Sequence, residues 1–157
     1  MCYLLEDVLF ITKMKVAEIQ IAYRTKPENK VVISNSQVAY NLILEHWSMD
    51  TIELQEESKI LLLNAANKVL GVHDLSKGGV SSSVLDVRII LGIALKCLAS
   101  GIILVHNHPS GSMVASDADL NITKKLKLAC ELMEMKLFDH LIISKDEYLS
   151  LADKGYM

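Results

Sequence analysis

The sequence lacks any apolar run of the ~20 residues that a membrane-spanning helix requires. Its longest apolar stretch, residues 87–105, is interrupted by Arg88, Lys96 and a Ser-Gly pair at 100 and 101, which predicts a buried helix followed by a buried strand. The first fifteen residues place acidic side chains early and end in lysines, the reverse of a secretory signal peptide. We therefore expect no association with a membrane.

The sequence also contains few cysteines and has no excess of positive charge. The three cysteines are widely spaced, and Cys97 and Cys130 fall within helical patterns, where small buried apolar residues are expected. This usage predicts a reducing, cytoplasmic setting. A net charge of −3 provides no large electrostatic footprint for nucleic acid, so direct nucleic-acid binding by this chain is not expected.

The 157 residues are enough for one ordinary domain with a substantial core, and 51% of them are apolar. Residues 17–26 alternate apolar and polar side chains, which predicts an amphipathic strand. Residues 35–48 combine an Asn/Ser cap with an apolar stripe that is typical of a helix. Residues 59–63 and 69–73 predict two strands joined by a tight asparagine-rich turn.

The second half of the chain continues this alternation. Residues 85–99 are apolar nearly all round, which predicts a helix buried on most faces. Residues 101–106 predict a short apolar strand, residues 117–135 a helix, and residues 136–153 a further strand and an edge strand. No repeat, low-complexity tract or linker interrupts the pattern, so we predict one α/β domain of mixed, α+β character.

The stretch HNHPSGSMVASDAD, residues 106–119, directly follows a predicted strand. Strand geometry points His106 and His108 to the same face, and two such imidazoles can hold one ion at ~2.0–2.1 Å from each nitrogen. Asp119 lies three residues after Ser116, in the first turn of the next helix, and can face back as an oxygen ligand. Two histidines and one carboxylate leave a fourth position for water, as catalytic zinc sites require.

The same letters also have a structural interpretation. Ser116-x-x-Asp119 is typical of a helix capping box, in which hydroxyl and carboxylate satisfy free backbone amides. Pro109 and Gly111 turn the chain, and Gly111 offers a position that can take a positive φ. A single histidine is usually a packed or surface residue. The combination of all these features directly after a buried strand nevertheless favours a metal site.

The spacing His-x-His-x7-Ser-x2-Asp resembles the JAMM signature of the JAB/MPN metallopeptidase superfamily. The Pro-Ser-Gly insert and the segments LLLNAANKVLG and FDHLII resemble its bacterial RadC branch, often labelled as DNA repair proteins. The resemblance runs from about Ile19 to the C-terminus, so we place a RadC-like domain at residues 15–157, after an extension of unclear role at residues 1–14. It implies a cytidine-deaminase-like fold with a central mixed β-sheet flanked by helices.

Carried onto this sequence, the resemblance implies that His106, His108 and Asp119 bind Zn²⁺. It also implies that Ser116 sits beside the metal-bound water or a developing oxyanion. The activity it implies is the hydrolysis of amide or isopeptide bonds.

The superfamily also uses a glutamate from an upstream strand as general base. RadC sequences tend to read Gln-Glu-x-Phe where this chain has Gln55, Glu56 and Ser58, which favours Glu56 as the base. Glu57 remains the alternative, because a one-residue shift in register turns a side chain to the opposite face. Two residues depart from the family pattern: Ser58 replaces a phenylalanine, and Ala115 replaces a proline before the motif serine.

Other polar residues carry weaker predictions. Asp139 and His140, together with Glu57, are candidates for contacts behind the metal ligands, and strand-end structure is the alternative for the Asp-His pair. Arg88 either pairs with a carboxylate or grips a substrate, with pairing favoured. Ser110 either contacts substrate or stabilises the turn. No role is predicted for His46, His73 and Ser150.

The function predicted from the sequence is therefore that of a zinc-dependent hydrolase acting on a protein, a peptide or a small amide. One alternative is an accessory protein linked to DNA repair or mobile elements. Another is a non-catalytic interaction module of the MPN type. An exposed strand edge could support a homodimer.

Overall fold

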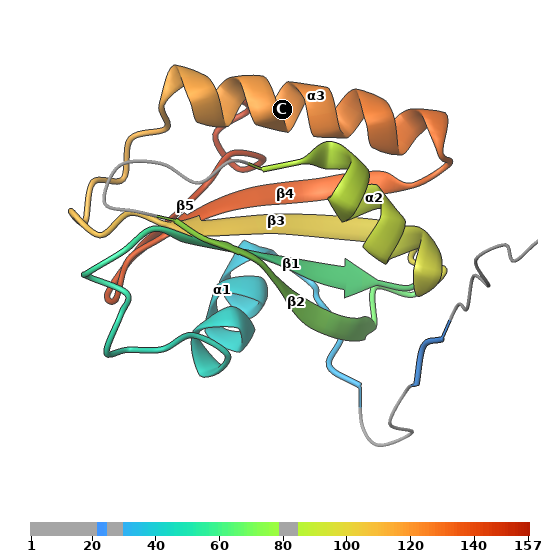
Figure 1. Ribbon diagram of the computed structural model, residues 1–157, viewed down its shortest axis with the longest axis horizontal. Coiled ribbons are helices and arrows are strands. Elements are labelled where there is room, and N and C mark those ends of the chain that lie inside the picture. Colours follow the sequence, from blue (N-terminus) through green and yellow to red (C-terminus); the bar gives the residue numbers. More distant parts are fainter. Residues whose placement is uncertain (1–21, 25–29, 79–84) are drawn as a thin grey trace, which may run out of the picture.

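The computed structural model describes residues 22–24, 30–78 and 85–157, in which a five-stranded sheet carries helices on both faces (Figure 1). The strand order is β2-β1-β3-β4-β5. Strands β3 and β4 pair in parallel, and the other neighbouring pairs are antiparallel. The predicted mixed α/β domain is confirmed. The strands are β1 (Glu57–Leu63), β2 (Val69–Lys77), β3 (Gly101–Asn107), β4 (Lys136–Ile143) and β5 (Tyr148–Ser150).

Within the described residues, three helices cover the sheet. The helix α1 (Ser36–Glu45) packs on one face, and α2 (Val87–Lys96) and α3 (Asp117–Leu132) cover the other (Figure 1). Each begins at a residue whose side chain accepts a hydrogen bond from a backbone amide of the first turn. The capping residues are Asn35, Asp86 and Ser116.

The connections bring three chain segments to one end of the sheet. Parallel strands require a crossover connection, and α3 lies in the crossover between β3 and β4. The chain therefore leaves the end of β3, turns, and enters α3. Because β1 runs antiparallel to β3, its first residues lie beside the last residues of β3, and Ser58 is directly opposite His106.

The core consists of two layers, separated by the alternation of side chains along the strands. On β3, Ile103 and Val105 belong to the layer under α1, whereas Ile102 and Leu104 belong to the layer under α2 and α3. Every position of β1 and β3 is buried, as expected for strands covered on both faces. Burial of each large aliphatic side chain contributes about 1.5–3 kcal/mol to the free energy of folding. The sheet is therefore a rigid support for the residues at the ends of its strands.

The asparagine-rich turn between the first two strands is confirmed. The Asn64 Oδ1 accepts from the Ala66 and Lys68 amides at 2.9 Å each. Asn67 takes the left-handed conformation with φ 55°, which asparagine tolerates better than most residues. Both strands are longer than predicted, since β1 begins at Glu57 and β2 continues to Lys77.

Two expectations for the helices were wrong. The helix α2 is buried on one face only: Ile89 is 57% and Leu95 45% exposed, because the sheet and α3 cover one side and nothing described covers the other. The helix α3 ends at Leu132, three residues before the predicted end at residue 135, and Met133 beyond it is 48% exposed. Glu134 then turns the chain with φ 55°.

Other predictions concern the ends, the cysteines and the sheet edges. Residues 1–14 lie outside the described residues, as does most of the strand predicted at 17–26. Within the described part of the chain, no helix has the length and apolar character needed to cross a membrane. Cys130 is fully buried and Cys97 half-buried, both against the α2/α3 layer. Strands β2 and β5 are the sheet edges, and the homodimer stays a prediction.

Candidate metal centre

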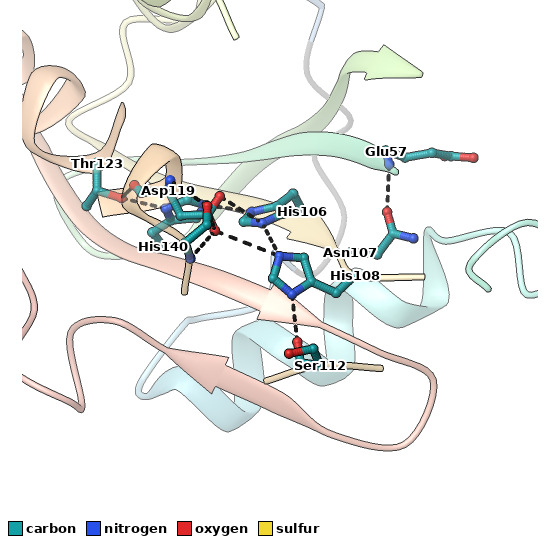
Figure 2. Close-up of polar contacts among 9 residues, drawn as sticks. Glu57, His106, Asn107, His108, Ser112, Asp119, Thr123 and His140 are labelled. Atoms are coloured by element: carbon teal, nitrogen blue, oxygen red, sulfur yellow. Dashed lines mark hydrogen bonds and ion pairs between the residues drawn. The ribbon is translucent and has the colours of Figure 1, made fainter. Parts of the chain in front are cut away.

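The structure brings together the three residues predicted to bind a metal. His106 is the penultimate residue of β3, His108 directly follows that strand, and Asp119 lies in the first turn of α3. The two Nε2 atoms are 3.1 Å apart, and the His106 Nε2 is 3.2 Å from the Asp119 Oδ1 (Figure 2). The His108 Nε2 is 3.8 Å from the Asp119 Oδ2. One donor atom from each residue therefore faces a common point.

The spacing and the protons of this cluster fit a zinc ion. Donor atoms bound to tetrahedral zinc at ~2.0–2.1 Å lie about 3.3 Å from one another. The His106 Nε2 is close to this spacing from the His108 Nε2, at 3.1 Å, and from the Asp119 Oδ1, at 3.2 Å, whereas His108 and Asp119 are farther apart, at 3.8 Å. The His108 Nδ1 is 2.6 Å from the Ser112 carbonyl oxygen, which can only accept, so in the neutral ring the proton is on Nδ1. The Nε2 of His108 then presents a lone pair to the cluster.

Asp119 is both a helix cap and a member of this cluster. The Ser116 backbone amide and hydroxyl donate to the Asp119 Oδ2 at 2.7 Å each, and the Asp119 amide donates to the Ser116 Oγ. The capping box considered in the sequence is therefore present. It leaves the Oδ1 facing His106, so the structural and metal-binding interpretations are compatible.

The Asp119 carboxyl is ionised in this setting. Its burial opposes ionisation, but the neighbouring His106 ring, when it is protonated, and the hydrogen bonds from Ser116 outweigh that effect. Together they hold the pKa of Asp119 well below its usual range. An anionic oxygen is the form that a metal cation requires.

The β1–β3 register separates the two candidate bases. Because Ser58 is opposite His106, strand alternation turns Glu57 to the other face, and it would turn Glu56, which directly precedes β1, to the face of His106. The Gly78 amide donates to the Glu56 carbonyl at 2.8 Å, which continues the β1–β2 ladder and keeps this segment extended. The register therefore favours Glu56.

Glu57 is occupied on the opposite face. It is 1% exposed, and its Oε1 accepts from the Thr51 hydroxyl and the Gln55 amide at 2.9 Å each. Figure 2 shows its side chain pointing away from the two histidines. The expectation that Glu57 contacts the metal ligands from behind was wrong, because strand alternation turns it toward α1.

Asn107, between the two histidines, holds the segment that carries Glu56. Its side chain is fully buried, and its Nδ2 donates to the Ile52 and Gln55 carbonyls at 2.6 and 2.9 Å. Its Oδ1 accepts from the Glu57 amide at 2.6 Å. Two of these bonds lie immediately before and after Glu56. Sequence reasoning missed this role; an asparagine ending a fully apolar strand was the available signal.

Comparisons with known proteins identify the family. Residues 33–156 match the family model described as the RadC-like JAB domain. The chain belongs to this family. Relatives named UPF0758 protein include one from Flavobacterium johnsoniae, 47% identical over 64% of this chain and 44% of the relative. Another from Porphyromonas gingivalis is 43% identical over 80% of this chain and 54% of the relative. A third from Caldanaerobacter subterraneus is 36% identical over 84% and 55%.

The chain spans about half the length of the curated relatives it matches. Their names state no activity. The RadC-like assignment therefore supports the fold and the JAB superfamily, and the chemistry depends on the residues of the site.

The adjacent residues Asp139 and His140 lie on opposite faces of β4. The His140 Nε2 is 2.8 Å from the His106 Nδ1, directly behind the cluster. Asp139 lies in the α1 layer, where it accepts from the Ser150 hydroxyl at 2.6 Å and from the Ala152 amide at 3.0 Å. Burial raises the pKa of Asp139 despite these hydrogen bonds. The prediction that Asp139 contacts the ligands was wrong, because it shares a strand with His140 but not a face.

The remaining candidates lie apart from the cluster or at its rim. Arg88 pairs with Asp86 at 2.6 Å and is 90% exposed, which confirms the structural interpretation. Gly111 has the expected positive φ of 74°. Ser110 accepts from the Ser112 amide at 3.4 Å within this turn. The histidines without a predicted role, His46 and His73, are not members of the cluster.

Proposed function

We propose that this chain is a zinc-dependent hydrolase of amide or isopeptide bonds. The observation that carries the proposal is the convergence of His106, His108 and Asp119 within 4.8 Å of one another at the end of β3. The lone pair of His108 and the ionised carboxylate face that point. Membership of the RadC-like JAB family supports this reaction class.

His106, His108 and Asp119 would hold the ion. When bound there, zinc supplies a Lewis acid that polarises a carbonyl and lowers the pKa of a coordinated water to about 7. Three protein ligands leave one position open, as in catalytic sites.

Glu56 and Ser116 supply the protein's own chemistry. The Glu56 carboxylate accepts a proton from the attacking water and delivers it to the leaving amine, a contribution of about 10²–10⁴-fold. The exposed Ser116 hydroxyl donates its single proton to the Asp119 Oδ2 in this structure, and in the reaction it would turn from that carboxylate to donate to the developing oxyanion. The register of β1 against β3 supports Glu56 in this role over Glu57.

A polar cavity next to the cluster supports an amide-containing substrate. It has a volume of about 180 Å³ and lies between the turn 108–111 and the loop 144–147. Its lining includes Glu53, Ser110 and Lys145, which offer both donors and acceptors to a peptide backbone or a small amide. The substrate is accordingly a protein, a peptide or a small amide.

Zinc analysis and peptide cleavage test this proposal. We expect the purified chain to hold one zinc per molecule after loading and dialysis, and the H108A variant to hold none. In H₂¹⁸O, a library of peptides and lysine ε-isopeptides should give products with ¹⁸O in the new carboxyl group. The E56Q variant should keep the zinc and lose cleavage, because only the proton acceptor is removed.

The matched control is E57Q, which changes the neighbouring carboxylate on the opposite face and should retain cleavage. Full activity of E56Q would show that the base is assigned wrongly. If the chain binds one zinc per molecule but cleaves neither the peptides nor the isopeptides, the non-catalytic interaction module would be favoured. A wild-type chain that takes up no zinc would end the hydrolase proposal.

The DNA-linked alternative has its own discriminating measurement. Binding to duplex DNA across a salt series should show no steep loss of affinity, because the net charge of −3 offers few phosphate contacts. A steep loss would favour the accessory function. We also propose a cytoplasmic setting, which the free thiols of Cys97 and Cys130 support.

A further inference from the structure

A chain of buried polar side chains runs behind the metal cluster. The His106 Nδ1 is 2.8 Å from the His140 Nε2, and the His140 Nδ1 is 2.6 Å from the Thr123 hydroxyl. That hydroxyl is 2.5 Å from the carbonyl oxygen of Asp119 (Figure 2). His106, His140 and Thr123 are at most 2% exposed. The proposed function assigns no role to His140 or Thr123.

The proton positions along this row of hydrogen-bonded side chains follow from the group at its end, the carbonyl oxygen of Asp119. A carbonyl oxygen can only accept, so the single hydroxyl proton of Thr123 is directed at Asp119. The short contact with His140 then requires a proton from the His140 Nδ1. Because this ring is completely buried, where a charge is costly, it is neutral and its Nε2 carries only a lone pair.

The same reasoning extends to the metal cluster. The lone pair of the His140 Nε2 accepts a proton from the His106 Nδ1. The neutral His106 ring then has no proton on Nε2, the atom that faces Asp119 and His108. The opposite direction of hydrogen bonding would put a proton at this atom, in the place of the metal.

We propose that Thr123, acting through His140, sets the tautomer of His106 so that its Nε2 is available as a metal ligand. Thr123 is a positioning residue, four positions after Asp119 on the same face of α3. One helix thus supplies the carboxylate ligand and the hydroxyl that directs the protons of a histidine ligand. The metal-binding part of this inference rests on the proposed zinc site, whereas the tautomer of the metal-free protein does not.

Nitrogen NMR of the histidine rings tests the tautomer directly. In the metal-free wild-type protein at about pH 8, where ordinary histidines are neutral, His106 should carry its proton on Nδ1. In T123V the valine cannot accept a hydrogen bond from the His140 Nδ1. The hydrogen bond between His140 and His106 is then expected to reverse, with the His140 Nε2 as donor, and the proton of His106 moves to its Nε2. T123S retains the hydroxyl and should retain the wild-type tautomer.

Zinc affinity provides the second readout, measured by competition with a chelator. T123V should bind zinc about 10–100-fold more weakly than wild type, the usual effect of removing a group that orients a ligand. T123S and T51V should stay within about threefold. Thr51 is the matched control, because its hydroxyl bonds Glu57 on the other face of the sheet.

A proton on the Nε2 of His106 in the metal-free wild type would overturn the inference without any variant. So would a T123V protein with both the wild-type tautomer and the wild-type zinc affinity. A wild-type chain with the expected tautomer but no zinc uptake would instead overturn the proposed function, and with it the metal-binding part of this inference.

Discussion

Each face of the sheet carries a carboxylate largely shielded from solvent, Asp119 beside the end of β3 on the α3 side and Asp139 opposite Ile103 on the α1 side. Asp139 accepts from the Ser150 hydroxyl and from the backbone amides of His140 and Ala152. Asp119 accepts from Ser116 with its Oδ2, which also lies 3.8 Å from the His108 Nε2, and presents its Oδ1 to the His106 Nε2 at 3.2 Å. The first environment is closed, and the second is open to a further ligand.

Depth does not explain this difference, since Asp139 is 6% exposed and the Asp119 side chain 14%. The neighbours do. Burial raises the pKa of Asp139, whereas a protonated His106 ring and the Ser116 donors keep the pKa of Asp119 low against the same effect. A carboxylate whose oxygens all accept hydrogen bonds serves the fold, and one with an uncommitted oxygen beside other lone pairs is available to a cation.

The largest expected effect separates the two carboxylates by metal binding. D119N should weaken zinc binding by more than the ~100-fold that loss of a supporting group can cause, because an amide oxygen lacks the charge of the ligand. D139N should leave zinc affinity unchanged, since its side chain lies on the other face. Chelator competition measures both. Equal losses in the two variants would refute the contrast between the faces.

A smaller effect concerns Asn107, the buried amide on the α1 side. N107A should lower the free energy of unfolding by about 3 kcal/mol, because it leaves two carbonyls and one amide without their buried partner. Urea denaturation of the metal-free protein measures this loss. N121A is the control, because Asn121 is exposed on α3. A loss as small as that of N121A would show that Asn107 does not hold the Glu56 segment.

The smallest expected effect is a pH dependence of stability at Asp139. Its pKa is higher in the folded than in the unfolded protein, so its stabilising contribution is present at low pH and is lost as the pH rises through the folded value. D139N, an amide that can keep the same partners, escapes this loss. The stability of D139N relative to wild type should rise between about pH 4 and pH 7 in urea denaturation. A constant or falling difference would contradict the raised pKa.

Much of the site could be predicted because its residues are close in sequence. The segment from His106 to Asp119 contains a strand end, a glycine turn and a capped helix start, and each of these can be recognised from neighbouring residues in the sequence. The hairpin was predictable from Asn64 and Asn67 for the same reason. The helix at α2 was predicted too, but its covered face was not, because its residues are apolar nearly all round and only the arrangement of its neighbours determines which side is covered.

The order of residues along the chain was sufficient to determine the element types, the candidate ligands and the zinc-site hypothesis, since hydrogen bonding and apolar periodicity act between near neighbours. Only the tertiary structure turned Glu57 away from the histidines, placed Asp139 and His140 on opposite faces of β4, and brought Thr123 behind His106. The physical reason is that strand pairing sets which face each side chain takes, and this pairing joins segments dozens of residues apart.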